Sequence, residues 1–238
     1  MCIRDREDTA KQLHFDDYSL IDYNRAGIPL IEIVTKPTIR SGAAAAAYLE
    51  RLRQIFLFTE VSDAKMEEGS MRCDVNVSIR PYGSEKFGTR TEIKNLNSIS
   101  NVQKAIEFEV ARQEKVLISG GEVLQETRRY DEDSKETVVM RAKGDAVDYK
   151  YYPEPNILPI RLNHQWVEGI IERIPEMPES RVARYINEYK IPKTDALILV
   201  QTKEVSDFFD ATVAYTKHYK IASNWLLGEV QALSLIHI

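Results

Sequence analysis

Acidic residues recur on segments whose sequence predicts β-strands. Glu32 lies inside the apolar run of residues 30–34, Asp74 and Glu92 lie on the polar sides of two later segments, and Glu7 stands near the start. Strand carboxylates are oxygen ligands of the kind that Mg²⁺ takes, and Mg²⁺ neutralises ATP phosphates during phosphoryl transfer. The pattern allows such a site. Solvated carboxylates give the same spacing, and Glu32 alone also fits a surface-facing or arginine-paired residue on an edge strand.

Two cationic residues accompany these carboxylates. Arg72 ends the segment 66–72 (MEEGSMR), whose glycine and serine allow backbone amides to approach a phosphate, and Lys94 shares a predicted strand with an acidic residue. From charge and position we infer that Arg72 and Lys94 contact a nucleotide. The simpler interpretations are a tight turn before Arg72 and, after Lys94, a helix cap formed by Asn97 or Ser98.

Cations also alternate with aromatic residues in two places. Residues 128–130 read RRY and residues 149–152 read YKYY. Such mixtures suit nucleotide or RNA contact, because bases stack on aromatic rings and phosphates pair with cations. They are equally common on ordinary strands, and both interpretations stay open.

The sequence predicts an α+β fold, in which both strands and helices position these residues. Residues 71–80 alternate strictly between apolar and polar, which predicts a strand, and residues 89–95 predict a second strand that pairs with it as a hairpin. Helices are predicted at residues 41–58, with Ser41 as N-cap, and at residues 100–118. The apolar stripe of the second helix consists of Val102, Ile106, Val110 and Leu117. Further strands are predicted near residues 123–130 and 137–142.

The character of the chain changes near Pro175. Before it, prolines at positions 153, 155 and 159 mark an irregular crossing; after it, residues 180–189, 195–200, 205–219 and 223–232 all read as helices. We therefore predict one part at residues 7–175 and an all-α part at residues 176–232. Residues 1–6 and 233–238 fit neither pattern and are interpreted as ends foreign to the gene.

The bulk composition excludes several classes. The 238 residues are 43% hydrophobic and 29% charged, as in an ordinary globular protein, and contain no apolar run long enough to span a membrane. The two cysteines, Cys2 and Cys73, are far apart, which argues against a disulfide scaffold and fits a reducing compartment. The net charge of −5 does not predict a nucleic-acid binder, although an acidic total can hide a local basic face.

Several ordered motifs resemble one family, the B subunits of the bacterial and organellar aspartyl/glutamyl-tRNA amidotransferases. The motifs are residues 22–33 (DYNRAGIPLIEI), 65–76 (KMEEGSMRCDVN), 92–98 (EIKNLNS), 125–128 (QETR), 148–155 (DYKYYPEP) and 223–226 (SNWL). The resemblance runs in order from about residue 7 to residue 232. Ordered blocks over such a length are far more specific than any single short motif.

The resemblance implies a function. Proteins of this family are part of a carbon–nitrogen ligase that uses ATP, Mg²⁺ and glutamine to convert Glu-tRNA(Gln) to Gln-tRNA(Gln) and Asp-tRNA(Asn) to Asn-tRNA(Asn). The tRNA-bound carboxylate is phosphorylated, and ammonia from the amidase A subunit displaces the phosphate. A small C subunit completes a heterotrimer, which is cytoplasmic or organellar. The implied fold is a cradle domain with an antiparallel sheet, like that of glutamine synthetase, followed by the start of a helical tRNA-binding domain.

The resemblance also implies roles for particular residues. Glu7 and Glu32 align with metal ligands of the family, and Glu32, Asp74 and Glu92 align with acidic residues of its catalytic pocket. The family has a long segment before Glu7, with further site residues, that this chain lacks, and Arg6 stands where an acidic residue is usual. We therefore expect the chain as it stands to be inactive.

Two rival interpretations remain. One is another carboxylate-activating ATP enzyme on a similar sheet, which would consume ATP without tRNA. The other is a non-catalytic RNA-binding protein, which would tolerate the substitution Glu32→Gln.

Overall fold

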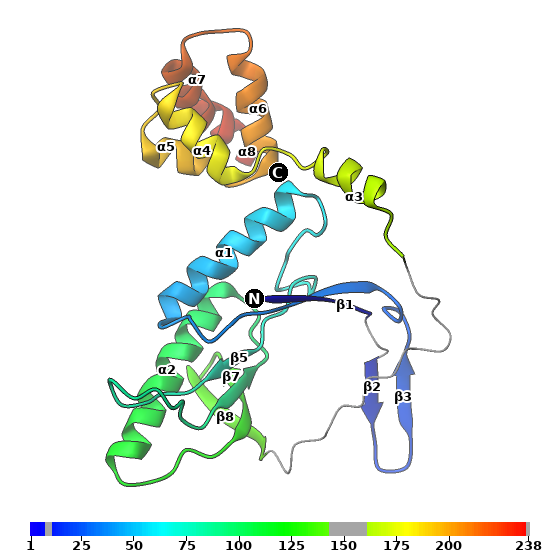
Figure 1. Ribbon diagram of the computed structural model, residues 1–238, viewed down its shortest axis with the longest axis vertical. Helices are drawn as coiled ribbons and strands as arrows, with labels where there is room; N and C mark the ends of the chain where they lie inside the picture. The colour runs from blue at the N-terminus through cyan, green and yellow to red at the C-terminus, as the bar shows by residue number, and fades with distance from the viewer. Residues whose placement is uncertain (8–10, 143–160, 237–238) are drawn as a thin grey trace. The chain divides into compact units, whose positions relative to one another are not determined.

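The computed structural model describes residues 1–7, 11–142 and 161–236 (Figure 1). The predicted proline-rich crossing and the motif at residues 149–152 lie outside these described residues. The chain divides into two compact units, Met1–Arg40 and Ser41–Ile238. The predicted boundary near Pro175 stays a prediction.

The first unit consists of two antiparallel strand pairs. β1 (Cys2–Glu7) pairs with β4 (Pro29–Val34), and β2 (Lys11–His14) pairs with β3 (Ser19–Asp22). The predicted turn before β4 is present: the Asp22 carboxylate accepts from the Asn24 N–H at 3.0 Å, and Gly27 takes a φ of +78° that glycine adopts without strain. The predicted strand at residues 30–34 is confirmed.

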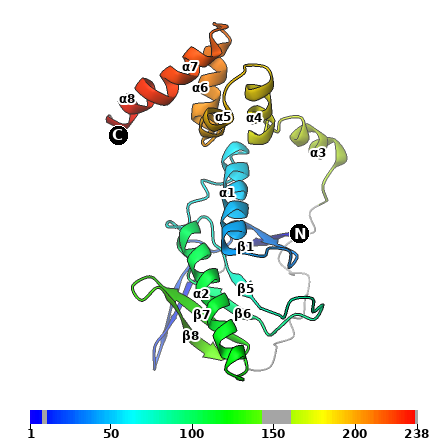
Figure 2. The same cartoon turned by 90° about the vertical axis from the view of Figure 1, so that its left-hand side faces the viewer.

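The second unit contains a four-stranded sheet in the order β5-β6-β7-β8 (Figure 2). Its strands are β5 (Val75–Val77), β6 (Thr91–Lys94), β7 (Glu126–Asp131) and β8 (Glu136–Ala142). The β5–β6 and β7–β8 pairs are antiparallel, but β6 and β7 are parallel. The prediction of an antiparallel sheet is therefore wrong for this pair. The reason is that α2 (Ile99–Ile118) connects β6 to β7, and a helical crossover returns the chain in the same direction.

The strand predicted at residues 71–80 is much shorter. Only Val75–Val77 form ladder bonds, because their partner β6 offers only Thr91, Glu92 and Ile93 in register. The alternation nevertheless holds in burial: Met71 and Val77 are buried, whereas Asp74 is exposed. The predicted pairing of the two strands as a hairpin is confirmed.

Both long helices begin where the sequence predicts. The Ser41 side chain accepts from the Ala44 N–H at the start of α1 (Gly42–Phe58), and the Ser98 side chain accepts from the Asn101 N–H at the start of α2. The helices pack together, and a Cβ atom added at Gly42 would lie 2.7 Å from the Gln103 carbonyl oxygen. Glycine at this position therefore permits the close approach.

The buried face of α2 differs from the predicted stripe. Val102 and Ile106 are buried as expected, but Val110 and Leu117 are exposed. Glu109 and Gln113 take their place, both with 0% exposure. A pattern of apolar residues cannot show this, because polar partners on the sheet make burial of these side chains possible.

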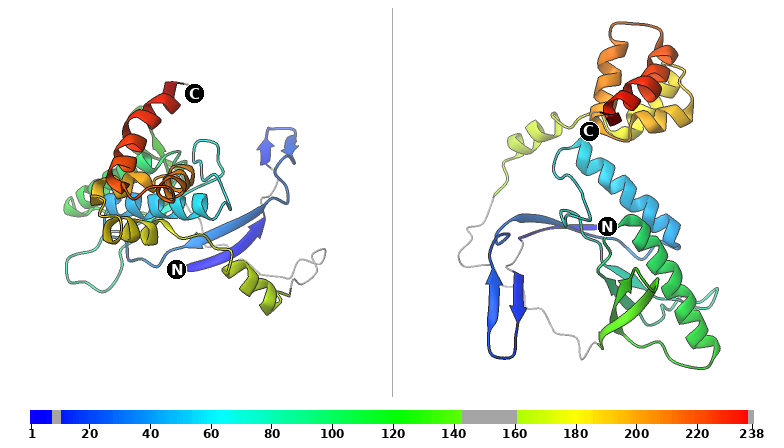
Figure 3. Two further views of the ribbon diagram at one scale, coloured as in Figure 1. Left: turned by 90° about the horizontal axis from the view of Figure 1, so that it is seen from above. Right: turned by 180° about the vertical axis from the view of Figure 1, so that it is seen from behind.

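The remaining helices follow residue 161. They are α3 (His164–Ile171), α4 (Pro178–Asn187), α5 (Lys193–Leu199), α6 (Lys203–Val213), α7 (Tyr219–Trp225), the π-helix η1 (Leu226–Val230) and α8 (Gln231–Ile236) (Figure 3). The helix predicted at residues 205–219 ends at Val213, because the Thr216 hydroxyl accepts from the His218 N–H and forms a local turn. Within the described parts of the chain, no helix combines the length and apolar character that a membrane crossing requires.

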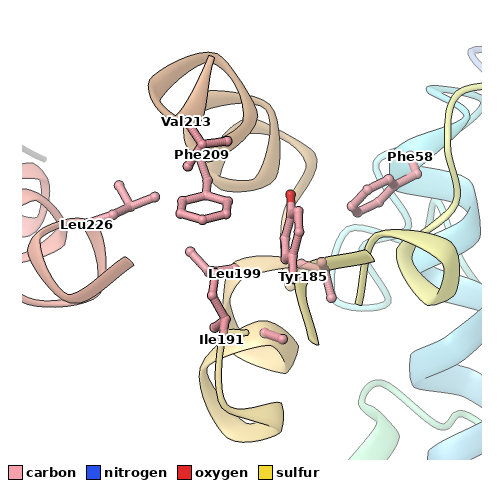
Figure 4. Close-up of a cluster of buried hydrophobic side chains, with 9 residues drawn as sticks. Phe58, Tyr185, Ile191, Leu199, Phe209, Val213 and Leu226 are labelled. Carbon is pink, nitrogen blue, oxygen red and sulfur yellow. The ribbon is translucent and has the colours of Figure 1, made fainter. Parts of the chain in front are cut away.

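An aromatic core joins α4, α5, α6 and η1 to α1. Tyr185 lies between Phe209 and Phe58, which comes from the end of α1 (Figure 4). Its ring meets that of Phe209 edge to face at a centroid distance of 4.9 Å. The buried guanidinium of Arg181 lies 5.2 Å from the Phe58 ring and donates to the Ser206 hydroxyl at 2.7 Å. This core therefore ties α4 to both α6 and α1.

Two adjacent phenylalanines give a matched test of this core. Phe209 has 0% exposure and Phe208 has 54%. We expect Phe209→Ala to lower the free energy of unfolding by about 3–5 kcal/mol, because it leaves a cavity between Tyr185 and its neighbours. Phe208→Ala should change it by less than about 1 kcal/mol. Urea denaturation followed by far-UV circular dichroism measures both, and equal losses would contradict the described core.

Candidate functional site

One face of the four-stranded sheet carries charged side chains and is not covered by α2. In β5 and β6, Asn76 pairs with Glu92, so Asp74, Asn76, Glu92 and Lys94 lie on the same face by strand alternation. We call this the open face. The structure thus brings together three residues that the sequence predicted: Asp74, Glu92 and Lys94.

Lys94 lies between the two carboxylates. Its Nζ atom is 3.4 Å from Asp74 Oδ2 and 3.8 Å from Glu92 Oε1. The Glu92 side chain is 17% exposed, against 52% for Asp74. A partly exposed pair of this kind contributes little to stability. The carboxylates of Asp74 and Glu92 flank the single ammonium group of Lys94, which can exchange these partners for others. This arrangement is suited to binding an ion or a charged ligand.

β7 extends the open face with Thr127, which the sequence analysis did not select as a site residue, and with Arg129 of the RRY motif. Parallel register pairs Glu92 with Thr127 and Lys94 with Arg129. The Thr127 hydroxyl donates to Glu92 Oε2 at 3.0 Å, and Arg129 forms an ion pair with Asp131 at 3.1 Å. The alternation of Thr127 and Arg129 in the predicted strand was a signal, but their closeness to Glu92 depends on the parallel pairing.

The covered face holds a buried charged lattice, defined by Glu109, Arg112, Glu126, Arg128 and Thr137. The Glu109 carboxylate accepts from Arg112 at 2.6 and 2.9 Å and from the Thr137 hydroxyl at 2.8 Å. Arg128 lies 3.6 Å from Glu109, donates to the Thr137 hydroxyl at 2.9 Å and also donates to Glu126. Every charge in the lattice therefore has an opposite partner, as burial demands.

The lattice sets the ionisation of Glu109. Burial alone would raise the pKa of this carboxyl, but hydrogen bonds from Arg112, Gln113 and Thr137 outweigh it and hold the pKa below its ordinary value. Glu109 is therefore charged at neutral pH, and it binds α2 to the sheet.

The RRY motif divides between the two faces. Arg128 and Tyr130 are buried beneath α2, whereas the Arg129 side chain is 46% exposed. The ordinary-strand interpretation holds for Arg128, because the lattice occupies its guanidinium. Arg129 remains accessible on the open face.

The segment before Arg72 is a tight turn, as the simpler interpretation held. Gly69 takes a φ of +78°, and the Ser70 hydroxyl accepts from the Lys65 N–H at 2.9 Å and donates to Asp63. The serine is thus used within the turn. Arg72 itself is exposed.

Glu7 and Glu32 belong to the first unit. In the β1–β4 pair, Glu7 stands opposite Pro29 and Glu32 opposite Arg4. Glu32 is about half-buried, and the structure describes only the backbone of Glu7. Their predicted role as metal ligands stays a prediction.

The open face has a donor set that fits Mg²⁺. No cluster of three or more histidine, cysteine or acidic side chains with metal-binding geometry occurs among the described residues. Magnesium does not need one, because it commonly binds through one or two carboxylates and completes its shell with water and substrate phosphates. Asp74 and Glu92 supply two such carboxylates.

Comparison with known proteins identifies the family. A family model described as the GatB/GatE catalytic domain matches residues 3–168. The chain is 55% identical over 226 residues to a Bacillus cereus protein and 57% identical over 227 residues to one from Ligilactobacillus salivarius. The name of each relative is that of the B subunit of an aspartyl/glutamyl-tRNA(Asn/Gln) amidotransferase. Each match covers 95% of this chain and 48% of the relative, so the chain spans about half the length of these relatives.

This chain belongs to the GatB/GatE catalytic domain family. The resemblance inferred from the sequence motifs is thereby confirmed. The likeness to the glutamine synthetase fold stays a prediction.

The pKa of Glu109 predicts how stability depends on pH. A carboxyl with a lowered pKa in the folded state stabilises the protein above its unfolded pKa, and this contribution is lost as the pH falls through the folded value. At pH 7, Glu109→Gln should lower the free energy of unfolding by about 3 kcal/mol, because buried arginines lose their partner. The difference from the wild type should shrink below about pH 4.

Thermal unfolding at a series of pH values measures this effect. Glu114→Gln is the matched control, since Glu114 is an exposed glutamate of the same helix. It should match the wild type at every pH. A penalty for Glu109→Gln that does not change between neutral and acid pH would contradict the assignment.

Proposed function

We propose that this chain is part of the B subunit of a tRNA-dependent amidotransferase, a carbon–nitrogen ligase. Its reaction converts Glu-tRNA(Gln) to Gln-tRNA(Gln) and Asp-tRNA(Asn) to Asn-tRNA(Asn). Support comes from family membership and from the names of relatives that match nearly the whole chain. The single observation that carries the chemistry is the open face, where Asp74, Glu92 and Lys94 gather beside Arg129.

The proposed chemistry is ATP-dependent activation of the side-chain carboxylate on the tRNA, followed by displacement with ammonia derived from glutamine. ATP phosphates and a substrate carboxylate are all anionic, so the site must offset several negative charges at once. Mg²⁺, when bound, supplies most of that neutralisation. Lys94 and Arg72 are the proposed phosphate contacts, and Arg129 adds a third cation.

The acidic residues have a complementary role. Asp74 and Glu92 offer oxygen ligands for the cation from the open face. Glu7 and Glu32 are proposed as metal ligands, carried over from the family resemblance, with Glu32 also serving in catalysis. The Lys94 ammonium holds the two open-face carboxylates close together until a ligand arrives.

The relatives' names describe one subunit of a larger enzyme, which supports an assembly with other subunits. The amidase A subunit would supply ammonia and the small C subunit would complete a heterotrimer, in the cytoplasm or an organelle. The helical residues 176–232 are the proposed start of the tRNA-binding part.

The test uses a chimeric protein in which this chain replaces the matching half of the Bacillus cereus relative, assembled with that enzyme's partner subunits. The chimera should convert Glu-tRNA(Gln) only when ATP, Mg²⁺ and glutamine are present. Glu92→Gln should lower the rate about a hundredfold or more, because it removes a charged ligand from the site. Formation of Gln-tRNA(Gln) measures the rate.

Glu50→Gln is the control for this substitution, since Glu50 is an exposed glutamate on α1. It should leave the rate unchanged. Full activity of the Glu92→Gln chimera would overturn the assignment of the open face, and ATP consumption without tRNA would favour a different carboxylate-activating enzyme.

A further inference from the structure

A buried threonine holds one oxygen of Glu92. The Thr127 side chain donates its hydroxyl to Glu92 Oε2 at 3.0 Å, and Thr127 is only 2% exposed. The other carboxylate oxygen, Oε1, lies 3.8 Å from the Lys94 ammonium. The carboxylate is therefore contacted from two directions, by a neutral donor that is buried and by a cation that is partly exposed.

The two contacts differ in how firmly they are fixed. A lysine has a flexible four-carbon stem, whereas a β-branched threonine on a strand has few allowed side-chain conformations. Hydrogen bonds to a charged group are also stronger than those between neutral groups. Thr127 is thus the better restraint on the orientation of Glu92, while Lys94 is free to exchange its partner for a ligand.

Thr127 is itself held by the lattice on the covered face. Its neighbours Glu126 and Arg128 lie on the covered face. There Arg128 donates to Glu126, to the Thr137 hydroxyl at 2.9 Å and to the Thr137 carbonyl at 2.6 Å. The register of β7 against β8 shifts between Thr127 and Arg128. Such irregularities often redirect a side chain beside a functional site.

We propose that Thr127 is a positioning residue of the open face, which orients the Glu92 carboxylate for the ligand and is kept in place by the buried charged lattice. This inference rests on the proposed function, because it assigns Thr127 a role through Glu92. It predicts that loss of the hydroxyl matters only while Glu92 is a carboxylate.

The test is a double-mutant cycle in the chimeric enzyme, measured in single turnovers with enzyme in excess over Glu-tRNA(Gln). Thr127→Val keeps the shape of the side chain but removes the donor, and should lower the amidation rate roughly tenfold to a hundredfold. Thr127→Ser retains the hydroxyl and should restore the rate to within about threefold of the wild type. In the Glu92→Gln background, Thr127→Val should have almost no further effect.

Thr91→Val provides the matched structural control. Thr91 is also buried on a central strand, but its hydroxyl accepts from Gln113 at 3.3 Å on the covered face. Thr91→Val should lower the melting temperature without slowing amidation. A similar loss of rate in Thr91→Val and Thr127→Val would mean that both act only through the stability of the sheet, and would overturn the proposal.

Two further outcomes separate this proposal from the proposed function. If Thr127→Val and Glu92→Gln reduce the rate independently, so that their effects multiply, the positioning role is wrong while the active face stands. If Glu92→Gln alone keeps full activity, the assignment of the open face fails, and the positioning role fails with it.

Discussion

The buried carboxylate of Glu109 is the constraint on which the sheet depends. A charge with no exposure to water is tolerated only with close partners, and Glu109 finds them in Arg112 on its own helix and in Arg128 and Thr137 on the sheet. These contacts hold α2 against one face of the sheet. Glu92, Lys94 and their neighbours lie on the open face, on the opposite side of the sheet. The lattice on the covered face therefore determines which side chains of β7 lie on the open face.

Much of the fold could be predicted from the sequence where short-range signals decide. Ser41 and Ser98 cap their helices through bonds to residues three positions later, and alternation from Met71 to Val77 correctly separates buried from exposed side chains. The parallel pairing of β6 with β7 could not be predicted, because it depends on how α2 packs. The burial of Glu109 could not be predicted for a similar reason, because its partners on the sheet, Arg128 and Thr137, are distant in sequence.

The candidate site was likewise predicted only in part from the sequence. Strand alternation placed Glu92 and Lys94 on one face, and pairing of the hairpin brought Asp74 beside them. Thr127 was missed, and Arg129 was selected only as part of the RRY motif, since only the parallel register makes these two residues neighbours of Glu92 and Lys94. The roles of Glu7 and Glu32 come from family resemblance alone, and their strands form a separate compact unit.

The most direct test of the account is to locate the metal and nucleotide. A crystal structure of the chimeric protein, grown with Mn²⁺ and a non-hydrolysable ATP analogue, would locate the cation by anomalous scattering. We predict a manganese peak on the open face, bound by Glu92 and by phosphate oxygens, with Lys94 turned toward the nucleotide. A nucleotide and cation bound elsewhere, with the Asp74–Lys94–Glu92 contacts unchanged, would contradict it.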